Sequence, residues 1–227
     1  MREPDVTLTD YGLALECVVC AVTLGFAPTS RKGLRSAGVC FFVFLGLSAA
    51  TGGTVHGFCP DEQSPECRLL WQLTLQSIGV AAFSTWVLAA GLLAAGRAGR
   101  WLALAAAPQI ALYSVMVLVV TQKFWMAFTI YLPAALLLLA GFCRGVWRDG
   151  HRFLLVGALG SVTSFTSSFV QFMRIDIDPV YFNHNALAHV VQAVAVVLLL
   201  LGIRYAVGPV FQESRVARAA IVSPSKD

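Results

Sequence analysis

Charged residues are scarce in this chain. Asp, Glu, Lys and Arg make up 12% of its 227 residues, while 58% are hydrophobic and the mean hydropathy is +0.75. Typical soluble domains carry about twice that share of charged residues. The composition therefore excludes a soluble domain and predicts an integral membrane protein. The formal net charge of +4 gives no reason to expect nucleic-acid binding. Membrane topology and anionic lipid headgroups are sufficient to explain the basic loops.

Lysine is especially rare, and its positions exclude one class of membrane protein. The lysines are Lys32, Lys123 and Lys226, none of which lies in the last apolar segment. A retinal Schiff base of the rhodopsin type therefore has no attachment point there. Residues 1–10 lack the basic stretch of a secretory signal, so we expect no removable signal peptide. No internal repeat is visible, which argues against a transporter built from inverted halves.

Long apolar segments are what the chain has in abundance. A helix needs about 20 apolar residues to cross roughly 30 Å of hydrocarbon. Segments of about this length cover residues 8–26, 37–55, 69–93, 101–120, 124–142, 153–172 and 186–207. Because the fourth and fifth are separated only by residues 121–123, six helices with one misread hairpin is the alternative. We predict an all-α, polytopic seven-helix bundle over residues 1–207 and a polar cytoplasmic tail over 208–227.

The basic residues lie mostly on one side of the predicted bundle. That side carries Arg31, Lys32, Arg35, Arg97, Arg100, Arg144, Arg148, Arg152, Arg204, Arg215, Arg218 and Lys226. Since cytoplasmic loops retain Lys and Arg, the N-terminus is predicted outside and the C-terminus in the cytoplasm. Acidic residues gather in the outer segments instead, which makes the outer mouth attractive to cations. A composition rich in Ala, Val, Leu and Gly favours a bacterial inner membrane.

Two of the six cysteines bracket a short outer loop. Cys59 and Cys67 flank residues 60–66, which include two prolines. A pair of cysteines facing an oxidising compartment across such a loop predicts a disulfide. Cys17 and Cys20 form a Cys-x-x-Cys inside an apolar segment, where ordinary packing is the simpler interpretation.

Polar side chains within the apolar segments are the candidate functional groups, because such groups are costly in a bilayer unless partnered. Placed by depth along regular helices, most of them fall in the outer half of the bundle. The histidines are His56, which ends the second segment, and His184 and His189, which open the seventh. We predict an outer pocket with further contributions from Glu16, Gln76, Ser168, Gln171, Asn185 and Gln192.

The helical angle limits which histidines can share this pocket. At about 100° per residue, His189 shares a face with Asn185 and Gln192, whereas His184 and His189 are about 140° apart. His184 therefore joins the pocket only if the helix begins irregularly. Asn183 is a plausible N-cap for this helix, which would place His184 at the first helical position and leave its side chain some freedom.

Three interpretations of these residues stay open. In the first, the His, Asn and Glu side chains join helices by hydrogen bonds, and the pocket serves a sensor or a small-ligand binder without metal. In the second, His56, His184 and His189 bind zinc and leave a fourth position open for water. Glu16, or an outer acid such as Asp61 or Asp178, then acts as a base or orients a zinc ligand. In the third, His56 and His189 are the axial ligands of a haem.

At these histidines the chain resembles the seven-helix membrane hydrolases that include alkaline ceramidases and the progestin and adiponectin receptors. The resemblance implies a zinc ion held by His56, His184 and His189 beside a lipid-amide pocket. Four residues separate the last two histidines here, where the family has three. Gly52 stands where the family has a serine, and Asp61, in a loop, is the nearest match to its aspartate.

Our leading hypothesis is accordingly a zinc-dependent membrane hydrolase that takes a lipid amide or ester from the bilayer. Membrane lipids are the expected surroundings, and a lipid-like molecule is the expected substrate or ligand. The two alternatives are the metal-free sensor or binder and the haem protein.

Overall fold

The computed structural model describes residues 1–61, 63–94, 96–148, 150–209 and 211. Within this part of the chain, seven helical segments are long and apolar enough to cross a membrane. They are α1 (Pro4–Gly25), α2 (Lys32–Phe58), α3 (Pro65–Leu93), the combined span α4 (Gly96–Leu104), α5 (Ala106–Val115) and η1 (Met116–Val120), α6 (Trp125–Trp147), α7 (Leu154–Met173) and α8 (His184–Val207). The prediction of seven spans is confirmed, and the alternative of six is wrong.

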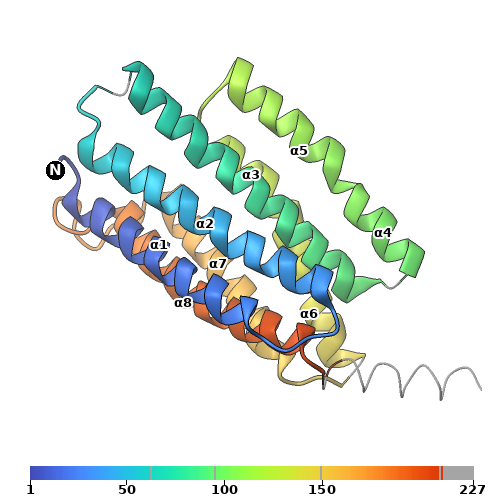
Figure 1. Cartoon of the computed structure of the whole chain (residues 1–227). Helices are drawn as coiled ribbons and strands as arrows, with labels where there is room; N and C mark the ends of the chain where they lie inside the picture. Colours follow the sequence, from blue (N-terminus) through green and yellow to red (C-terminus); the bar gives the residue numbers. More distant parts are fainter. Residues whose placement is uncertain (62, 95, 149, 210, 212–227) are drawn as a thin grey trace, which may run out of the picture.

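Six of these helices form a closed ring. Each helix packs against the next in the order α1, α2, α3, α6, α7, α8, and α8 packs against α1 to close it. Figure 1 shows the helices lying side by side along a common axis. The ring order follows the chain order except that α3 is followed by α6. The helices that carry the predicted pocket residues therefore face one interior.

The fourth span lies outside this ring. Its α4 and α5 segments pack mainly against α3 (Figure 1), and only 17% of its most apolar stretch is buried, against 61% for α3. The span has two interruptions, one between Leu104 and Ala106 and one where the last turn widens to the π-helix η1. Trp86 and Gln76 of α3 attach it through hydrogen bonds to Leu102 and Ser114. The fourth span therefore adds no wall to the interior of the ring.

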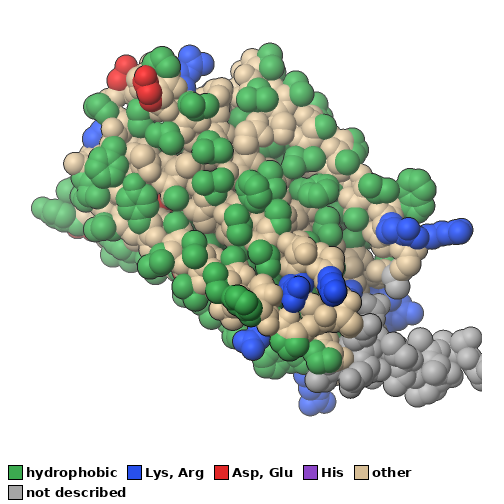
Figure 2. Space-filling view, in the orientation of Figure 1, with side chains coloured by type: hydrophobic (Ala, Val, Ile, Leu, Met, Phe, Trp, Pro, Cys, Tyr) green, Lys and Arg blue, Asp and Glu red, His purple; other side chains and the backbone are tan. Residues whose placement is uncertain are grey.

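Charge divides between the two ends of the bundle. In Figure 2 hydrophobic side chains cover the flank, acidic side chains lie at one end and most basic side chains lie at the other. We name these the acidic end, where α1 begins and α2 ends, and the basic end, where α1 ends and α2 begins. The flank matches a hydrocarbon environment, in which every backbone polar group must be satisfied within the helices.

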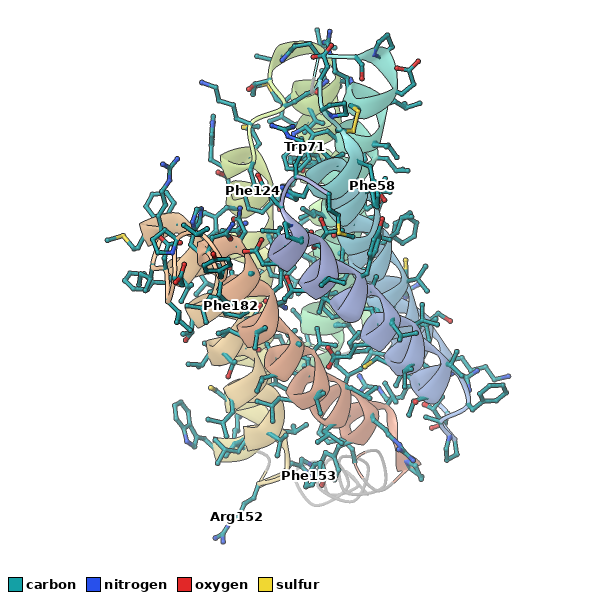
Figure 3. All side chains as sticks on the ribbon, turned by 90° about the vertical axis from the view of Figure 1, so that its left-hand side faces the viewer. Phe58, Trp71, Phe124, Arg152, Phe153 and Phe182 are labelled. Atoms are coloured by element: carbon teal, nitrogen blue, oxygen red, sulfur yellow. A yellow bond between two sulfur atoms is a disulfide. The ribbon has the colours of Figure 1, made fainter. Side chains whose placement is uncertain are left out.

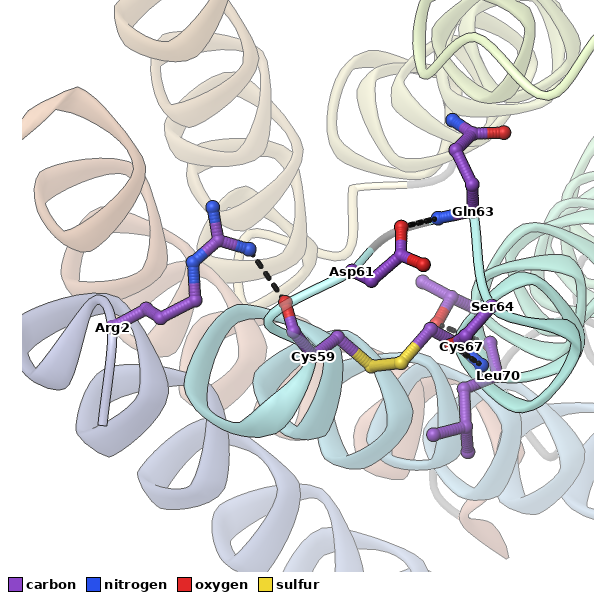
Figure 4. Close-up of a disulfide and its surroundings, with 8 residues drawn as sticks. Arg2, Cys59, Asp61, Gln63, Ser64, Cys67 and Leu70 are labelled. Carbon is purple, nitrogen blue, oxygen red and sulfur yellow. Dashed lines mark hydrogen bonds between the residues drawn. A yellow bond between two sulfur atoms is a disulfide. The ribbon is translucent and has the colours of Figure 1, made fainter.

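A disulfide joins α2 and α3 at the acidic end. Cys59 and Cys67 are bonded, with their Cα atoms 5.8 Å apart (Figure 4). The Arg2 guanidinium donates to the carbonyl oxygen of Cys59, and Ser64 caps α3 by accepting from the backbone amide of Cys67. The predicted disulfide is thus confirmed. It fixes the connection between two helices of the ring.

The predicted tail over residues 208–227 falls almost entirely outside the described residues. Of that segment the structure describes 208, 209 and 211. Phe211 is buried, and the Arg31 guanidinium lies 5.6 Å from the centre of its ring. Arg31 also donates to the carbonyl oxygens of Ala206 and Gly91, near the ends of α8 and α3. The basic ends of three helices are therefore tied together.

Candidate functional site

A cavity of about 560 Å³ occupies the interior of the ring, in the half toward the acidic end. Every helix of the ring contributes to its lining. Its size lies within the 300–1,000 Å³ or so that is common for small-molecule sites. Polar groups from α1, α7 and α8 and aromatic groups from α3 and α6 share the lining, so the cavity is amphipathic.

Asp10 and His189 form a pair of ionisable groups in the wall of the cavity. The Asp10 side chain is 6% exposed and the His189 side chain 17%, and His189 Nε2 lies 3.3 Å from Asp10 Oδ1. The other ring nitrogen, Nδ1, lies 3.2 Å from Thr9 Oγ1. Thr9 and Asp10 are neighbours on α1, so this one imidazole is held at both nitrogens by the same helix. The contact also gives the buried carboxyl a partner, which such groups require in a bilayer.

The other two histidines lie at the rim of the cavity, each beside its own carboxylate. His56 Nδ1 lies 2.8 Å from Glu3 Oε2, and His184 Nδ1 lies 3.1 Å from Asp176 Oδ1. His56 also meets the Trp71 ring edge to face, with ring centres 6.3 Å apart. Each contact orients a ring and joins two segments that are distant in the sequence or separated by a loop.

The loop between α7 and α8 presents Asp176 to His184. Asp178 and Phe182 exchange backbone hydrogen bonds, and Asp178 Oδ1 accepts from the backbone amides of Val180 and Tyr181. These two N–H groups hold the pKa of the Asp178 carboxyl below its usual value. Asn183 then caps α8 by accepting from the amides of Asn185 and Ala186.

A row of polar side chains joins α7 to α8 along one wall of the cavity. Ser164 donates to the side-chain oxygen of Gln192 at 3.0 Å, and Ser167 donates to the carbonyl oxygen of Ala188 at 2.7 Å. Nearer the acidic end, Gln171 Nε2 donates to Asn185 Oδ1 at 3.2 Å. This wall is held by its own hydrogen bonds, which fixes the polar surface offered to the cavity.

Aromatic side chains form another part of the lining, and some of them reach the surface of the bundle. Phe128 of α6 and Phe172 of α7 stack with ring centres 6.2 Å apart. Both line the cavity, yet Phe128 is 36% exposed and Phe172 is 71% exposed. Trp71 and Phe124, which also line the cavity, lie close together with ring centres 6.3 Å apart (Figure 3). We call the Phe128–Phe172 contact the aromatic portal, since the cavity meets the flank of the bundle there.

The model of a family of unknown function, DUF6962, matches residues 6–207. The chain is a member of DUF6962. No curated protein and no solved structure matches it. The match covers six spans in full, the first span from Val6 onward, and every residue that lines the cavity, so the cavity belongs to the DUF6962 region of the chain.

Most of the predicted pocket residues meet in this DUF6962 cavity. The lining includes His56, His184, His189, Ser168, Gln171, Asn185 and Gln192. His184 reaches it from the first position of the capped helix α8. The rim lies beside the helix end, where a side chain can lean inward without sharing the face of His189.

Three predicted site residues lie elsewhere. Gln76 faces away from the ring and exchanges hydrogen bonds with Ser114 of the fourth span. Asp61 lies in the exposed loop after α2, where it accepts from the backbone amide of Gln63 (Figure 4). Glu16 is half-buried on α1 but is absent from the described lining of the cavity. The carboxyl that α1 directs into the cavity is Asp10.

The three histidines do not form a ligand set in this arrangement. Across the described residues, no group of three or more His, Cys, Asp or Glu side chains is placed to hold a metal ion. Both nitrogens of His189 already have partners. His56 and His184 each use Nδ1 for a carboxylate, which leaves Nε2 for another contact.

Asp10 is a cavity residue that the sequence did not predict, because it stands close to Glu3 and Asp5 and looks like one more acid of the exposed N-terminus. A signal was nevertheless present in the spacing. Thr7 and Asp10 are three residues apart and share a helix face, and both are buried. Gly52 and Gly53 of α2 lie against that face. A polar pair opposite two adjacent glycines indicates a close helix contact with a carboxyl inside it.

Proposed function

We propose that this DUF6962 protein binds a lipid-like amphiphile in the central cavity and exchanges it with the membrane through the aromatic portal. The observation that carries the proposal is the continuity of the cavity from Asp10 and His189 to the exposed rings of Phe128 and Phe172. An amphiphile places its polar head among hydrogen-bonding groups and leaves its chain among apolar ones. The cavity offers both surfaces, and the portal adjoins the lipid-facing flank.

Polar groups with spare hydrogen-bonding capacity support the head-group site. The Gln192 and Asn185 side-chain oxygens accept from Ser164 and Gln171, which leaves their NH₂ groups available as donors. The apolar part of the lining comes from residues such as Leu13, Leu45, Ile78 and Phe128. This distribution fits one polar end and one chain rather than a wholly polar solute.

Photocrosslinking tests the proposal. A tetradecan-1-ol probe carrying a diazirine on its chain is added to the protein in phosphatidylcholine nanodiscs, and the modified peptides are identified by mass spectrometry. We expect crosslinks to cavity residues of α6 and α7. Ser168→Trp, which fills the cavity, should abolish them, whereas Thr166→Trp, on the exposed face of the same helix, should leave them unchanged. Crosslinks confined to lipid-facing residues in the unmodified protein would contradict the proposal.

A second candidate is the zinc-dependent hydrolase of a lipid amide or ester that the resemblance implies. One observation favours it, namely that Nδ1 of His56 and Nδ1 of His184 contact the carboxylates of Glu3 and Asp176. In many metal sites a carboxylate orients the histidine ligand through the same kind of contact. The engaged nitrogens of His189 favour the binder. If zinc is held there, it would supply a polarised water for hydrolysis.

Metal analysis separates the two candidates. Stoichiometric zinc in the purified protein, lost in the variant His56→Ala but kept in His151→Ala at the basic end, would support the hydrolase. A protein without bound transition metal that still crosslinks the probe in its cavity would support the binder.

A further inference from the structure

Asp10 is distinctive among the residues of the cavity wall. Within the described lining it is the one acidic residue, and His189 is the one hydrogen-bond or ion-pair partner of its carboxyl group among the described residues. His189 contacts Oδ1, so Oδ2 remains for a second partner. A carboxylate oxygen can accept more than one hydrogen bond, and it accepts most strongly from a charged donor.

Gly52 opens the approach to this second oxygen. A Cβ at position 52 would lie 3.8 Å from Asp10 Oδ2 and 3.5 Å from Thr74 Cγ2. Because glycine has no side chain, the space between α2 and the carboxyl remains part of the cavity, and Gly52 itself contributes to the lining. A ligand group can therefore come within hydrogen-bonding distance of Asp10 without displacing His189.

The aromatic wall favours the same kind of head group. The rings that line the cavity are Trp71, Phe124, Trp125, Phe128, Tyr131 and Phe172. The face of an aromatic ring attracts a cation, and the attraction is larger where water is excluded. A carboxyl group and several rings around one small volume form a combination that stabilises an ammonium group and offers less to an anion.

The charged residues at the rim of the cavity also favour a cationic ligand. Glu3, Asp5 and Asp176 lie at the rim beside His56, Asn183 and His184, and acidic clusters raise the local concentration of cations. Arg174 is the fixed positive charge in the described lining. It is exposed, beyond the end of α7, where water and salt screen it from the interior.

We propose that the ligand of this cavity is an amphiphile whose head is a positively charged amine, with the ammonium group on Asp10 and the chain directed toward Phe128 and Phe172. This inference rests on the proposed amphiphile binding and specifies its chemistry. His189 orients the carboxyl group from one side, and the amine donates to it from the other. The aromatic rings enclose the ammonium group and its first methylene groups.

Competition for the cavity tests the head group directly. Tetradecan-1-amine, tetradecan-1-ol and tetradecanoate, which share one chain length, compete with the diazirine probe in phosphatidylcholine nanodiscs. Each concentration is corrected for partitioning into protein-free nanodiscs. We expect the amine to displace the probe at a concentration about tenfold lower than the alcohol, because only the ammonium group carries a charge, and a desolvated cation on aromatic faces contributes about that factor. The carboxylate should be the weakest competitor.

Two carboxamide variants on α1 provide the matched control. Asp10→Asn keeps the shape of the side chain and removes its charge, so the preference for the amine over the alcohol should disappear. Glu16→Gln removes a carboxyl from the same helix outside the cavity, so the preference should remain. If Asp10→Asn does not fold, the order in which the amine, the alcohol and the carboxylate displace the probe from the unmodified protein still tests the preference for an amine.

The outcomes distinguish the two proposals. If the alcohol probe crosslinks within the cavity but amine and alcohol displace it equally, the amine inference is wrong and amphiphile binding stands. A preference for the amine that persists in Asp10→Asn also overturns the assignment to Asp10. If no probe crosslinks within the cavity, the proposed function itself fails.

Discussion

Gly53 of α2 lies directly against Asp10 of α1. A Cβ at position 53 would stand 2.7 Å from the Asp10 Cβ and 3.4 Å from the carbonyl oxygen of Thr7. No real Cβ tolerates the shorter contact, so the two helices approach this closely only because residue 53 is glycine. The same approach brings the Asp10 carboxyl group to the cavity edge beside Gly52.

The two adjacent glycines should respond oppositely to alanine. Gly53→Ala should lower the free energy of unfolding by about 1–3 kcal/mol, the usual cost of overpacking. Gly52→Ala makes only ordinary van der Waals contacts and should be neutral or slightly stabilising, since alanine favours the helix. Thermal unfolding in one detergent measures both. Equal losses in the two variants would contradict the close contact at Gly53.

Asp10 and His189 should be energetically coupled. His189→Leu leaves the buried carboxyl group without its partner, and a buried polar group left unsatisfied costs about 1–3 kcal/mol. Adding Asp10→Asn removes the orphaned carboxyl group, so the double variant should be more stable than His189→Leu alone. A double-mutant cycle from thermal unfolding measures the coupling. Strict additivity of the two changes would show that the pair does not interact.

The spans were predictable because hydropathy identifies apolar segments that are long enough to cross a bilayer. Each predicted segment lies within or close to an observed helix. The order of the helices around the ring was not predictable, because hydropathy does not specify neighbours. Gln76 illustrates this, since its partner Ser114 belongs to a span that lies outside the ring.

The histidines were recognisable from the sequence, but their partners were not. An imidazole inside an apolar segment is conspicuous, whereas Glu3 and Asp176 look like ordinary acids of exposed segments. They become partners of His56 and His184 only through the fold. Glu16 and Asp10 both lie on α1, but only packing against Gly53 decides that Asp10 faces the cavity.

Asn183 should stabilise the first turn of α8. The Asn183 side-chain oxygen accepts from two backbone amides of that turn, and the Asn183 backbone amide donates to Asp5 Oδ2. Asn183→Ala should cost about 1 kcal/mol, typical of a lost N-cap, whereas Asn183→Asp should keep most of that contribution. Hydrogen exchange of the His184 to Leu187 amides gives a local readout. Unchanged protection in Asn183→Ala would rule out the capping role.

The Cys59–Cys67 disulfide should add about 2–3 kcal/mol, by the chain-entropy estimate for a short loop, because it closes a sequence separation of 8 residues. The double change Cys59→Ser and Cys67→Ser removes it without leaving an unpaired thiol. Thermal unfolding of this variant should occur at a lower temperature. The control is Cys40→Ser, a cysteine that is not bonded. Equal stability of the double variant and the unmodified protein would exclude a stabilising role.

The acidic end is predicted to face outward. Tyr181 and Lys32 are exposed at opposite ends of the bundle, so Tyr181→Cys and Lys32→Cys place thiols on opposite sides of the membrane. A membrane-impermeant maleimide added to intact cells should label the first and spare the second. Labelling must become equal after the membrane is permeabilised. The reverse pattern would invert the topology.

The position of the fourth span explains how α3 and α6 can be neighbours. Both run from the acidic end to the basic end, so the chain must travel back along the bundle between them. The α4–α5–η1 segment makes this return outside the ring, as a crossover helix does between parallel strands of a sheet. Two parallel helices thus begin at the same end, which brings Trp71 near the start of one beside Phe124 at the start of the other. The aromatic side of the mouth is therefore a product of chain connectivity.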